Sequence, residues 1–416
     1  MPGYDKNRKA VITGYGVVSP LGSEVDAFWN GLLAGKSVAK RIERFDPSNL
    51  GVQFACEVDS AFDAKDYIDA KDFRRMDRFS QWGLAAAVMA FEHSGISKQK
   101  FDPARCGVVT GTGVGGITHL EEQWQVYNEK GSDRVSPFFV PAMMANAAAG
   151  HISIATGFAG VNFNVTTACA AGSHALGEAL RCIREGSADV MMAGGTEAGV
   201  TPLTVSAFGR MGALSGKNDD PTSASRPFDK DRDGFVIGEG AAFFTVESLE
   251  HATARGATIY AEISGYGRNG DAYHITAPSG IGAQQCMSLA LEDAGLEPDQ
   301  ITHINAHGTS TPMNDSKEAQ AIQNIFTNLD ELQVTSTKGV TGHLIAAAGA
   351  VEALAAILTI NNNLIPPTAN HVEADEDMKI NIVKGSPKEF FGDYVLSNSF
   401  GFGGHNASIV IARHKG

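Results

Sequence analysis

The chain has 416 residues, of which 43% are hydrophobic and 19% charged, a composition typical of a globular protein with a sizeable core. Its net charge of −14 argues against nucleic acid as a partner, because phosphate repulsion is not offset over most of the surface. The 5 cysteines are scattered without metal-type spacing and indicate free thiols of a reducing compartment. We see no apolar run approaching the ~20 residues that a membrane span needs, and we expect a cytoplasmic protein without membrane contact.

Strands and helices alternate along the whole chain. In the first part we predict strands at 10–18, 106–111, 161–165, 187–196 and 240–247, and helices at 25–34, 76–93, 118–129, 168–184 and 249–255. In the second part we predict strands at 261–265, 301–305, 333–337, 394–397 and 407–412, and helices at 284–294, 319–326 and 346–358. Loops are expected at 43–70, 131–141 and 201–234. This alternation predicts an α/β fold with mixed, mostly parallel sheets in two related halves, 1–256 and 257–416.

The junction of a predicted strand and helix at Cys169 is the first candidate site. Val161, Phe163 and Val165 alternate with asparagines as in a strand, and residues 168–184 have helical spacing. A thiol in the first turn of a helix faces free backbone N–H groups and the positive end of the dipole, which lower its pKa toward neutrality. We therefore expect Cys169 to be a nucleophile, the alternative being a small buried hydrophobic residue.

A glycine-rich turn suggests a competing function. Gly111, Gly113 and Gly116 match the G-x-G-x-x-G pattern of dinucleotide sites. Such a site also needs a second strand that ends in an acidic residue about 20 positions later, whereas a helix and a loop follow here. We favour a structural use of the glycines, which let two backbone segments approach closely, over an NAD(P)-binding oxidoreductase.

Two histidines follow predicted strands within glycine-rich turns. His307 lies just after the strand at 301–305, and His343 opens the helix that follows the strand at 333–337. Ligands collect at this end of parallel strands, although a structural role is the alternative for each ring. A helix N-terminus disfavours imidazolium, so we expect His343 to be neutral and to donate a hydrogen bond.

Three further features complete the candidate site. Lys338, if buried, requires a carboxylate, for which Glu318 is the candidate; a surface lysine is the alternative. Phe402 lies among glycines at 398–406, where its N–H can face a substrate oxygen. A basic cluster at i, i+3 and i+4 on a predicted helix is a candidate docking patch or a solvated surface cluster: Lys71, Arg74 and Arg75.

Four ordered motifs resemble the signatures of the β-ketoacyl-acyl-carrier-protein synthases. They read Thr167-Ala-Cys-Ala-Ala-Gly172, Asn305-Ala-His-Gly-Thr-Ser-Thr-Pro312, Lys338-Gly-Val-Thr-Gly-His343 and Asn398-Ser-Phe-Gly-Phe-Gly-Gly404. The resemblance spans essentially the whole chain. Within the family, the chain is most similar to the elongating type II branch. It implies a thiolase-like five-layered αβαβα fold, a homodimer, and an acyl carrier protein partner whose phosphopantetheine arm makes a separate cofactor unnecessary.

The resemblance also implies a decarboxylative condensation. Cys169 would take an acyl group from the carrier, with the N–H groups of Cys169 and Phe402 holding the oxyanion. His307 and His343 would hold the thioester oxygen of malonyl-carrier as carbon dioxide leaves, and Lys338 would support them with Glu318. The product would be a β-ketoacyl chain two carbons longer.

Other roles are implied by the same resemblance. Thr309 and Thr311 would contact the phosphopantetheine arm, Phe402 would gate the acyl pocket, and the remaining substrate-binding positions are Val114, Phe400 and Thr276. The basic cluster would be the carrier-docking helix. A structural sodium or potassium ion would lie near Asn305, Glu352, Ser397 and Asn398.

The closing motif departs from the commoner Gly-Gly-Thr-Asn because His405 replaces the threonine, as in actinobacterial relatives that include enzymes of mycolic-acid synthesis. A polyketide or mycolate pathway is therefore an alternative context for the same chemistry. A thiolase would have a second catalytic cysteine near the C-terminus, and none follows Cys286. A type III starter-unit synthase would have asparagine in place of His343, and a non-catalytic chain-length subunit would lack Cys169.

Overall fold

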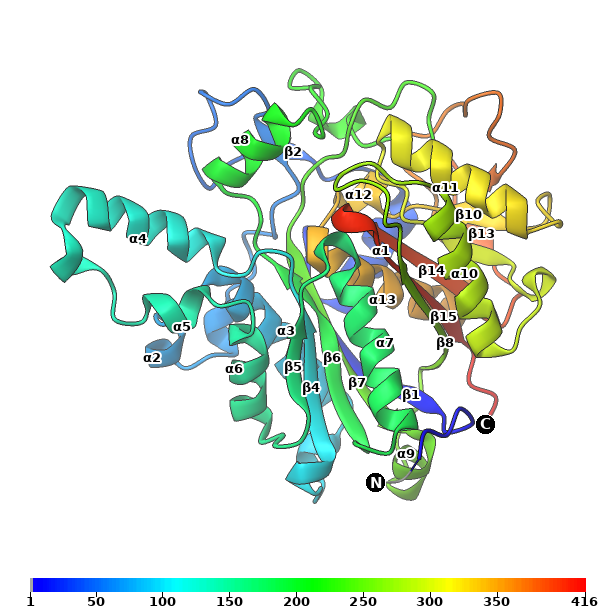
Figure 1. Cartoon of the computed structure of the whole chain (residues 1–416), viewed down its shortest axis with the longest axis horizontal. Coiled ribbons are helices and arrows are strands. Elements are labelled where there is room, and N and C mark those ends of the chain that lie inside the picture. The colour runs from blue at the N-terminus through cyan, green and yellow to red at the C-terminus, as the bar shows by residue number, and fades with distance from the viewer. Residues whose placement is uncertain (1–2) are drawn as a thin grey trace.

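The computed structural model describes residues 3–416 (Figure 1). Its first half contributes the strands β1 (Ala10–Val18), β4 (Cys106–Gly111), β5 (Asn162–Val165), β6 (Val190–Glu197) and β7 (Gly240–Ser248). Helices of this half include α1 (Val25–Ala34), α3 (Arg78–His93), α4 (Ile117–Lys130), α6 (Ala147–Thr156), α7 (Ala171–Arg184) and α9 (Leu249–Ala254).

The second half repeats this pattern. Its strands are β8 (Ala261–Gly270), β9 (His303–Asn305), β10 (Gln333–Thr335), β12 (Asn381–Ile382), β14 (Tyr394–Gly401) and β15 (His405–Ala412). Its helices are α10 (Ile281–Ala294), α11 (Pro312–Ile325), the short α12 (Lys338–Thr341) and α13 (Ala348–Asn362). Two short antiparallel strand pairs lie outside the main sheet, β2 (Lys40–Arg41) with β3 (Phe54–Ala55) and β11 (Leu364–Ile365) with β13 (Lys388–Glu389).

Within residues 3–416 the main strands form one mixed sheet in the order β12-β10-β9-β14-β15-β8-β1-β7-β6-β4-β5. Pairs toward both edges are parallel, such as β9 with β10 and β4 with β5, whereas the central pairs are antiparallel. β1 hydrogen-bonds to β7 of its own half and to β8 of the other. The predicted division at residue 256 falls between α9 and β8 and stays a prediction.

Three layers of helices alternate with the two halves of the sheet, which gives five layers in all. α7 and α13 form the central layer, since each contacts strands of both halves. α3 and α6 cover the strands of the first half, and α10 covers those of the second with α11 packed beside it. The predicted α/β, five-layered fold is confirmed. The segment Ile345–Asn362 is, in the described chain, the one helix apolar and long enough to cross a membrane, but 89% of it is buried inside the protein.

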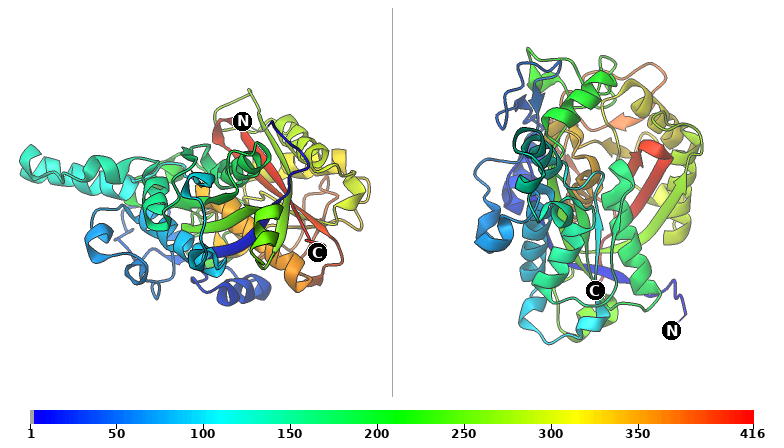
Figure 2. Two further views of the ribbon diagram at one scale, coloured as in Figure 1. Left: turned by 90° about the horizontal axis from the view of Figure 1, so that it is seen from below. Right: turned by 60° about the vertical axis from the view of Figure 1, so that its left-hand side comes forward.

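Several helices lie where the sequence predicted loops. α5 (Phe139–Met143) begins inside the predicted loop at 131–141 and extends past its end, and α8 (Pro202–Arg210) falls within the one at 201–234. Thr201 caps α8, because its hydroxyl accepts a hydrogen bond from the N–H of Thr204, and Pro202 occupies the first helical position. α4 and α5 together form an arm that projects from the body of the protein, and Figure 2 shows α4 extending sideways.

Candidate active site

A cavity of about 390 Å³ lies where several parallel strands end. Cys169 follows β5, His307 follows β9 and Phe402 follows β14. His307 and Phe402 lie at the same edge of the sheet because β9 and β14 are parallel neighbours, whereas Cys169 reaches the cavity from β5, the edge strand of the first half. All of the predicted catalytic and substrate-binding residues except Lys338 and Val114 line this cavity: Cys169, Thr276, His307, Thr309, Thr311, His343, Phe400 and Phe402.

Cys169 lies in a single 3-10 turn, Ala168–Ala170, directly before α7. The preceding Ala168 has φ 49°, a left-handed conformation that is costly for alanine and typical of constrained functional turns. The end of β14 packs against this turn: a Cβ on Gly401 would meet the carbonyl oxygen of Thr167 at 2.9 Å. The backbone N–H groups of Cys169 and Phe402 lie near enough to the sulfur to lower its pKa, so two donors are available beside the carbonyl of a group bound to it.

The expected lowering of the thiol pKa is wrong. Burial raises the pKa of Cys169 to about 11, while Lys338 and the two N–H groups act in the opposite direction without overcoming it. The 3-10 turn that holds Cys169 precedes α7, and removal of the sulfur from water outweighs the favourable end of that helix. The side chain of Cys169 is therefore a protonated thiol near pH 7.

His307 and His343 face one another across the cavity wall. Their ring centroids are 5.4 Å apart at an interplanar angle of 87°. Burial, with the nearby charge of Lys338 as the second cause, holds the pKa of each imidazole well below its usual range. Both rings are therefore neutral near pH 7. The expectation for His343 is correct in direction, but burial rather than a helix terminus is the main cause, because His343 follows α12 instead of opening a helix.

The two imidazoles are available to a ligand. Neither ring nitrogen of His343, nor Nδ1 of His307, has a hydrogen-bond partner among residues 3–416. Phe400 lies edge-on to His307 with centroids 5.9 Å apart, and Phe235 lies edge-on to His343 at 5.3 Å. Buried polar atoms are normally hydrogen-bonded, so these nitrogens indicate a site for a substrate oxygen.

The predicted partner of Lys338 is wrong. Lys338, 1% exposed, forms its ion pair with Glu352 of α13. Glu318 of α11 instead accepts hydrogen bonds from the backbone N–H groups of His307 and Gly308, each at 2.8 Å. Glu318 therefore supports the His307 turn through its backbone, while Lys338 supplies the positive charge near the imidazoles.

The polar wall of the cavity carries the hydroxyls of Thr309 and Thr311, whose Oγ1 atoms are 2.8 Å apart. Thr276 and the ring of Phe402 lie at other points of the lining. Val114 does not line the cavity, contrary to the prediction: it is 54% exposed and lies in the glycine turn before α4.

A carboxylate of the chain itself fills the glycine turn. Glu197, 1% exposed, accepts hydrogen bonds from the N–H of Gly113 at 2.6 Å and of Val114 at 3.3 Å. A dinucleotide phosphate would need these same donors. Occupation of the turn by Glu197 removes the basis for a nicotinamide site.

Three of the four residues predicted to bind a sodium or potassium ion have buried oxygen atoms that suit it. Oδ1 of Asn305, Oε2 of Glu352 and Oγ of Ser397 are buried and have no hydrogen-bond partner in the described part of the chain. Asn305 is aligned with Ser397 on the neighbouring strand, and its Nδ2 donates to the carbonyl of Glu352 at 3.3 Å. Asn398 differs, because its side chain bonds Glu318 and Ser408. Oxygen atoms of this kind are the ligands that hard cations prefer.

The basic cluster does not form one helical face. α2 (Ala70–Phe73) ends before Arg74, which forms its C-cap. Lys71 and Arg74 are exposed, whereas the guanidinium of Arg75 lies over the ring of Phe138, 4.3 Å from its centroid. The free positive charge of the cluster therefore resides mainly on Lys71 and Arg74.

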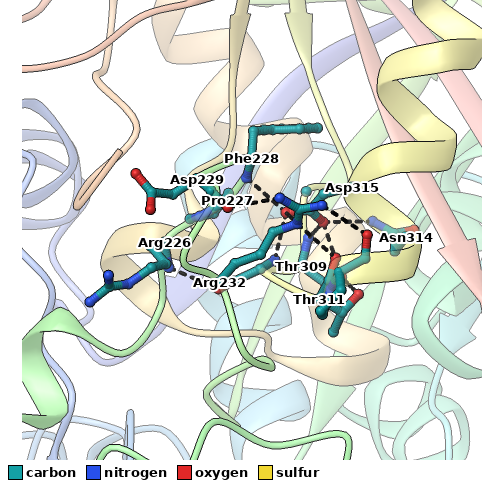
Figure 3. Close-up of polar contacts among 12 residues, drawn as sticks. Arg226, Pro227, Phe228, Asp229, Arg232, Thr309, Thr311, Asn314 and Asp315 are labelled. Atoms are coloured by element: carbon teal, nitrogen blue, oxygen red, sulfur yellow. Dashed lines mark hydrogen bonds and ion pairs between the residues drawn. The ribbon is translucent and has the colours of Figure 1, made fainter. Parts of the chain in front are cut away.

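Two buried charged residues beside the threonines of the cavity wall were not predicted. Asp315, fully buried, accepts hydrogen bonds from the N–H groups of Phe228 at 2.8 Å, Thr309 at 2.9 Å and Ser310 at 3.1 Å (Figure 3). Arg232 packs beside it (Figure 3). The signal for Asp315 was its place in the first turn after Pro312, but the helix was predicted to begin only at 319.

The chain belongs to the β-ketoacyl synthase family. Its residues 7–252 match the family model for the N-terminal domain of β-ketoacyl synthases, and residues 260–372 match the model for the C-terminal domain. The chain is 45% identical over 411 residues to the 3-oxoacyl-[acyl-carrier-protein] synthase 2 of Vibrio cholerae, with 98% of this chain and 99% of the relative covered. It is 46% identical over 411 residues to the protein of the same name from Coxiella burnetii, with the same coverage.

Solved structures give the same result. The ishigamide ketosynthase/chain length factor matches with a TM-score of 0.92 and 36% identity, covering 98% of this chain and all of that one (100%). A type II polyketide ketosynthase, solved in complex with its acyl carrier protein and bound to a hexaketide, matches with a TM-score of 0.90 and 32% identity over the same shares.

Proposed function

We propose that this chain is an acyltransferase that condenses malonyl-acyl-carrier-protein with an acyl group held on Cys169, with loss of carbon dioxide, to elongate fatty acyl chains by two carbons. The observation that carries the proposal is the convergence of Cys169 with His307 and His343, two neutral imidazoles with free ring nitrogens, on one cavity. The relatives of about 45% identity support fatty-acid elongation.

In the first step the sulfur of Cys169 attacks the thioester carbonyl of the acyl carrier. The bond from the carbonyl carbon to the pantetheine sulfur breaks, and the proton of the Cys169 thiol leaves with the released pantetheine thiol. The N–H groups of Cys169 and Phe402 stabilise the tetrahedral oxyanion. Because the thiol is protonated at rest, its proton has to be lost as the carbon–sulfur bond forms.

In the second step malonyl-carrier occupies the cavity. His307 and His343 donate hydrogen bonds to its thioester oxygen, the bond to the carboxylate breaks, and carbon dioxide leaves an enolate behind. The enolate carbon attacks the acyl-Cys169 carbonyl, the bond from that carbon to the sulfur breaks, and the departing thiolate takes up a proton from water. Neutral imidazoles suit this role, because they stabilise the oxygen without giving up a proton completely.

The remaining assignments follow from position. Thr309 and Thr311 contact the amide-rich phosphopantetheine arm, and Phe402, whose ring is 6.4 Å from that of Phe208, gates the acyl pocket. Thr276 and Phe400 line it. No separate cofactor is needed, and a sodium or potassium ion held by Asn305, Glu352 and Ser397 would neutralise buried oxygen atoms without taking part in the reaction. We place the enzyme in the cytoplasm.

The test is to mix the protein with acyl-carrier and malonyl-carrier and to measure carbon dioxide, the mass of the acyl-enzyme and the mass of the product. A β-ketoacyl product two carbons longer than the primer supports fatty-acid elongation. A polyketide context is the second candidate, favoured by the two ketosynthase neighbours of 32–36% identity. Repeated extension of an unreduced β-ketoacyl chain would indicate that context, and preference for very long primers a mycolate pathway.

We infer that Lys71 and Arg74 bind the acidic acyl carrier protein. The double variant Lys71→Glu, Arg74→Glu is expected to raise KM for acyl-carrier about tenfold with little change in kcat, because like charges then oppose docking. Acyl-pantetheine, which has no carrier protein, is the control and should react as with the wild type. An unchanged KM for acyl-carrier would remove this docking surface.

We infer that the arm is covered by a second copy of the chain. Trp124 and Tyr127 of α4 are 64% and 48% exposed and stack at 5.7 Å beside an apolar groove. In residues 3–416 the edge strand β5 has only β4 as a neighbour, so its other side is open to a symmetric partner.

Trp124→Glu is expected to convert the dimer to monomers in light scattering, since a buried interface tryptophan commonly contributes about 2 kcal/mol or more. Phe391, 88% exposed and far along the chain, provides the matched control: Phe391→Glu should remain dimeric. A dimeric Trp124→Glu protein would show that the arm is not the interface.

A further inference from the structure

Arg232 is a buried arginine whose bonds converge on the start of α11. Its side chain is 5% exposed. Nε donates to the carbonyl of Thr311 at 3.2 Å and Nη2 to that of Pro312 at 2.9 Å. Nη1 donates to the carbonyl of Asp229 at 2.8 Å and to the carboxylate of Asp375 at 2.7 Å. One guanidinium therefore joins its own loop, the segment around Asp375 and the first turn of α11.

Arg232 thereby binds the end of the threonine turn, residues 309–311. Asp315 binds the same turn through its backbone N–H groups. Asp315 accepts the N–H groups of Thr309 and Ser310, and Nε of Arg232 is 3.9 Å from its Oδ2 (Figure 3). Ser310 has φ 67°, a strained conformation that persists only when its surroundings impose it. Two buried, opposite charges thus fix a backbone that would otherwise relax.

The loop that carries Arg232, residues 226–235, forms further hydrogen bonds with the threonine turn. The N–H of Gly234 donates to the carbonyl of Ser310 at 3.0 Å, and the N–H of Arg226 donates to the hydroxyl of Ser310 at 2.9 Å. The next residue, Phe235, lines the cavity and packs on His343. A displacement of this loop would move the threonine hydroxyls relative to the imidazoles.

We propose that Arg232 is a positioning residue that sets the hydroxyls of Thr309 and Thr311 at the spacing that the amide groups of the carrier's arm require. This role rests on the proposed function, in which those hydroxyls bind the arm. The planar, permanently charged fork of arginine makes several bonds in fixed directions, which lysine cannot reproduce.

The test compares two thioesters of the same acyl group, a pantetheine thioester with amide groups and an ethyl thioester without them. Acylation of Cys169 is followed by protein mass at a series of concentrations. Arg232→Gln is expected to raise the half-saturating concentration of the pantetheine thioester about tenfold and to change that of the ethyl thioester less than about twofold. Arg232→Lys should lie between the wild type and Arg232→Gln.

The chain offers a matched control. Lys230 joins the same two loops through its exposed ion pair with Glu373, at 2.6 Å. Lys230→Gln should leave both thioesters unchanged. Asp375→Asn keeps the guanidinium and removes one of its anchors, so it should shift the pantetheine value in the same direction by a smaller factor, even if Arg232→Gln does not fold.

Equal losses with both thioesters would overturn the inference, since they would show a general structural role. Unchanged binding of the pantetheine thioester in Arg232→Gln would also overturn it. If Arg232→Gln does not fold, unchanged binding in both Arg232→Lys and Asp375→Asn has the same meaning. A matching shift in Lys230→Gln would overturn it as well. These outcomes leave condensation by the wild type intact. A wild type that forms no acyl-enzyme and no elongated product would overturn the proposed function, and this inference with it.

Discussion

Replacing Cys169 with alanine is expected to abolish the acyl-enzyme and to lower chain elongation by about 10⁴-fold or more, because no other nucleophile is placed at the thioester carbonyl. Release of carbon dioxide from malonyl-carrier should continue, since His307 and His343 are unchanged. The measurements are protein mass after incubation with acyl-carrier, and separate assays of product and carbon dioxide.

The matched control is Cys182→Ala, which removes another cysteine, buried in α7. It should retain both the acyl-enzyme and elongation. Acyl label on Cys182, or product formed by Cys169→Ala, would refute the assignment of the nucleophile.

The pH dependence of thiol alkylation follows from the same residue. Since the pKa of Cys169 is raised to about 11, the thiolate fraction should increase about tenfold per pH unit below that value. The rate of iodoacetamide labelling should therefore rise steadily from pH 7 to pH 10. A plateau near pH 7 would show instead that the helix end dominates, as the sequence alone suggested.

Replacing either His307 or His343 with alanine is expected to slow decarboxylation of malonyl-carrier about 10²-fold, because each removes an oxyanion donor worth on the order of 3 kcal/mol. Formation of the acyl-enzyme should change far less, since the N–H groups of Cys169 and Phe402 remain. The two half-reactions, followed separately by carbon dioxide release and by protein mass, distinguish these effects.

The lowered pKa values of His307 and His343 also predict how the rate of decarboxylation depends on pH. Because the pKa of each imidazole is lowered well below its usual range, both should stay neutral as pH falls from 8 to 6, and decarboxylation should show no loss near pH 6.5. His303, a buried histidine of β9, provides the control, and His303→Phe should leave both half-reactions unchanged. A titration near pH 6.5, or full decarboxylation by His343→Ala, would contradict the proposed donors.

Local sequence predicted elements well where one signal dominated. β1 and α1 have the predicted bounds, because an unbroken apolar run makes a buried strand and Gly35, with φ 61°, ends the helix. α8 was missed although Thr201 and Pro202 form a recognisable helix start. The helix has only 9 residues, and Val205 is the one residue that it buries, so it does not stand out from the loop around it.

The site could be predicted only as far as motifs and strand ends allowed. Two carboxylates, Glu318 and Glu352, lie near Lys338 in the sequence. Lys338 pairs with Glu352 because of how α13 and α11 pack, which no local pattern encodes. The pKa of Cys169 depends similarly on desolvation by distant segments. Val114 shows the same limit, because the bond from its N–H to Glu197 is a contact between segments 83 residues apart.

The central layer has a consequence for how such a protein can evolve and be engineered. α7 comes from the first half and α13 from the second, yet residues of both belong to one hydrophobic cluster together with strands of both halves. A fragment ending near residue 256 would expose apolar surface that only the other fragment can cover. Despite their repeated architecture, the halves are therefore not interchangeable modules, and substitutions in one are constrained by the shape of the other.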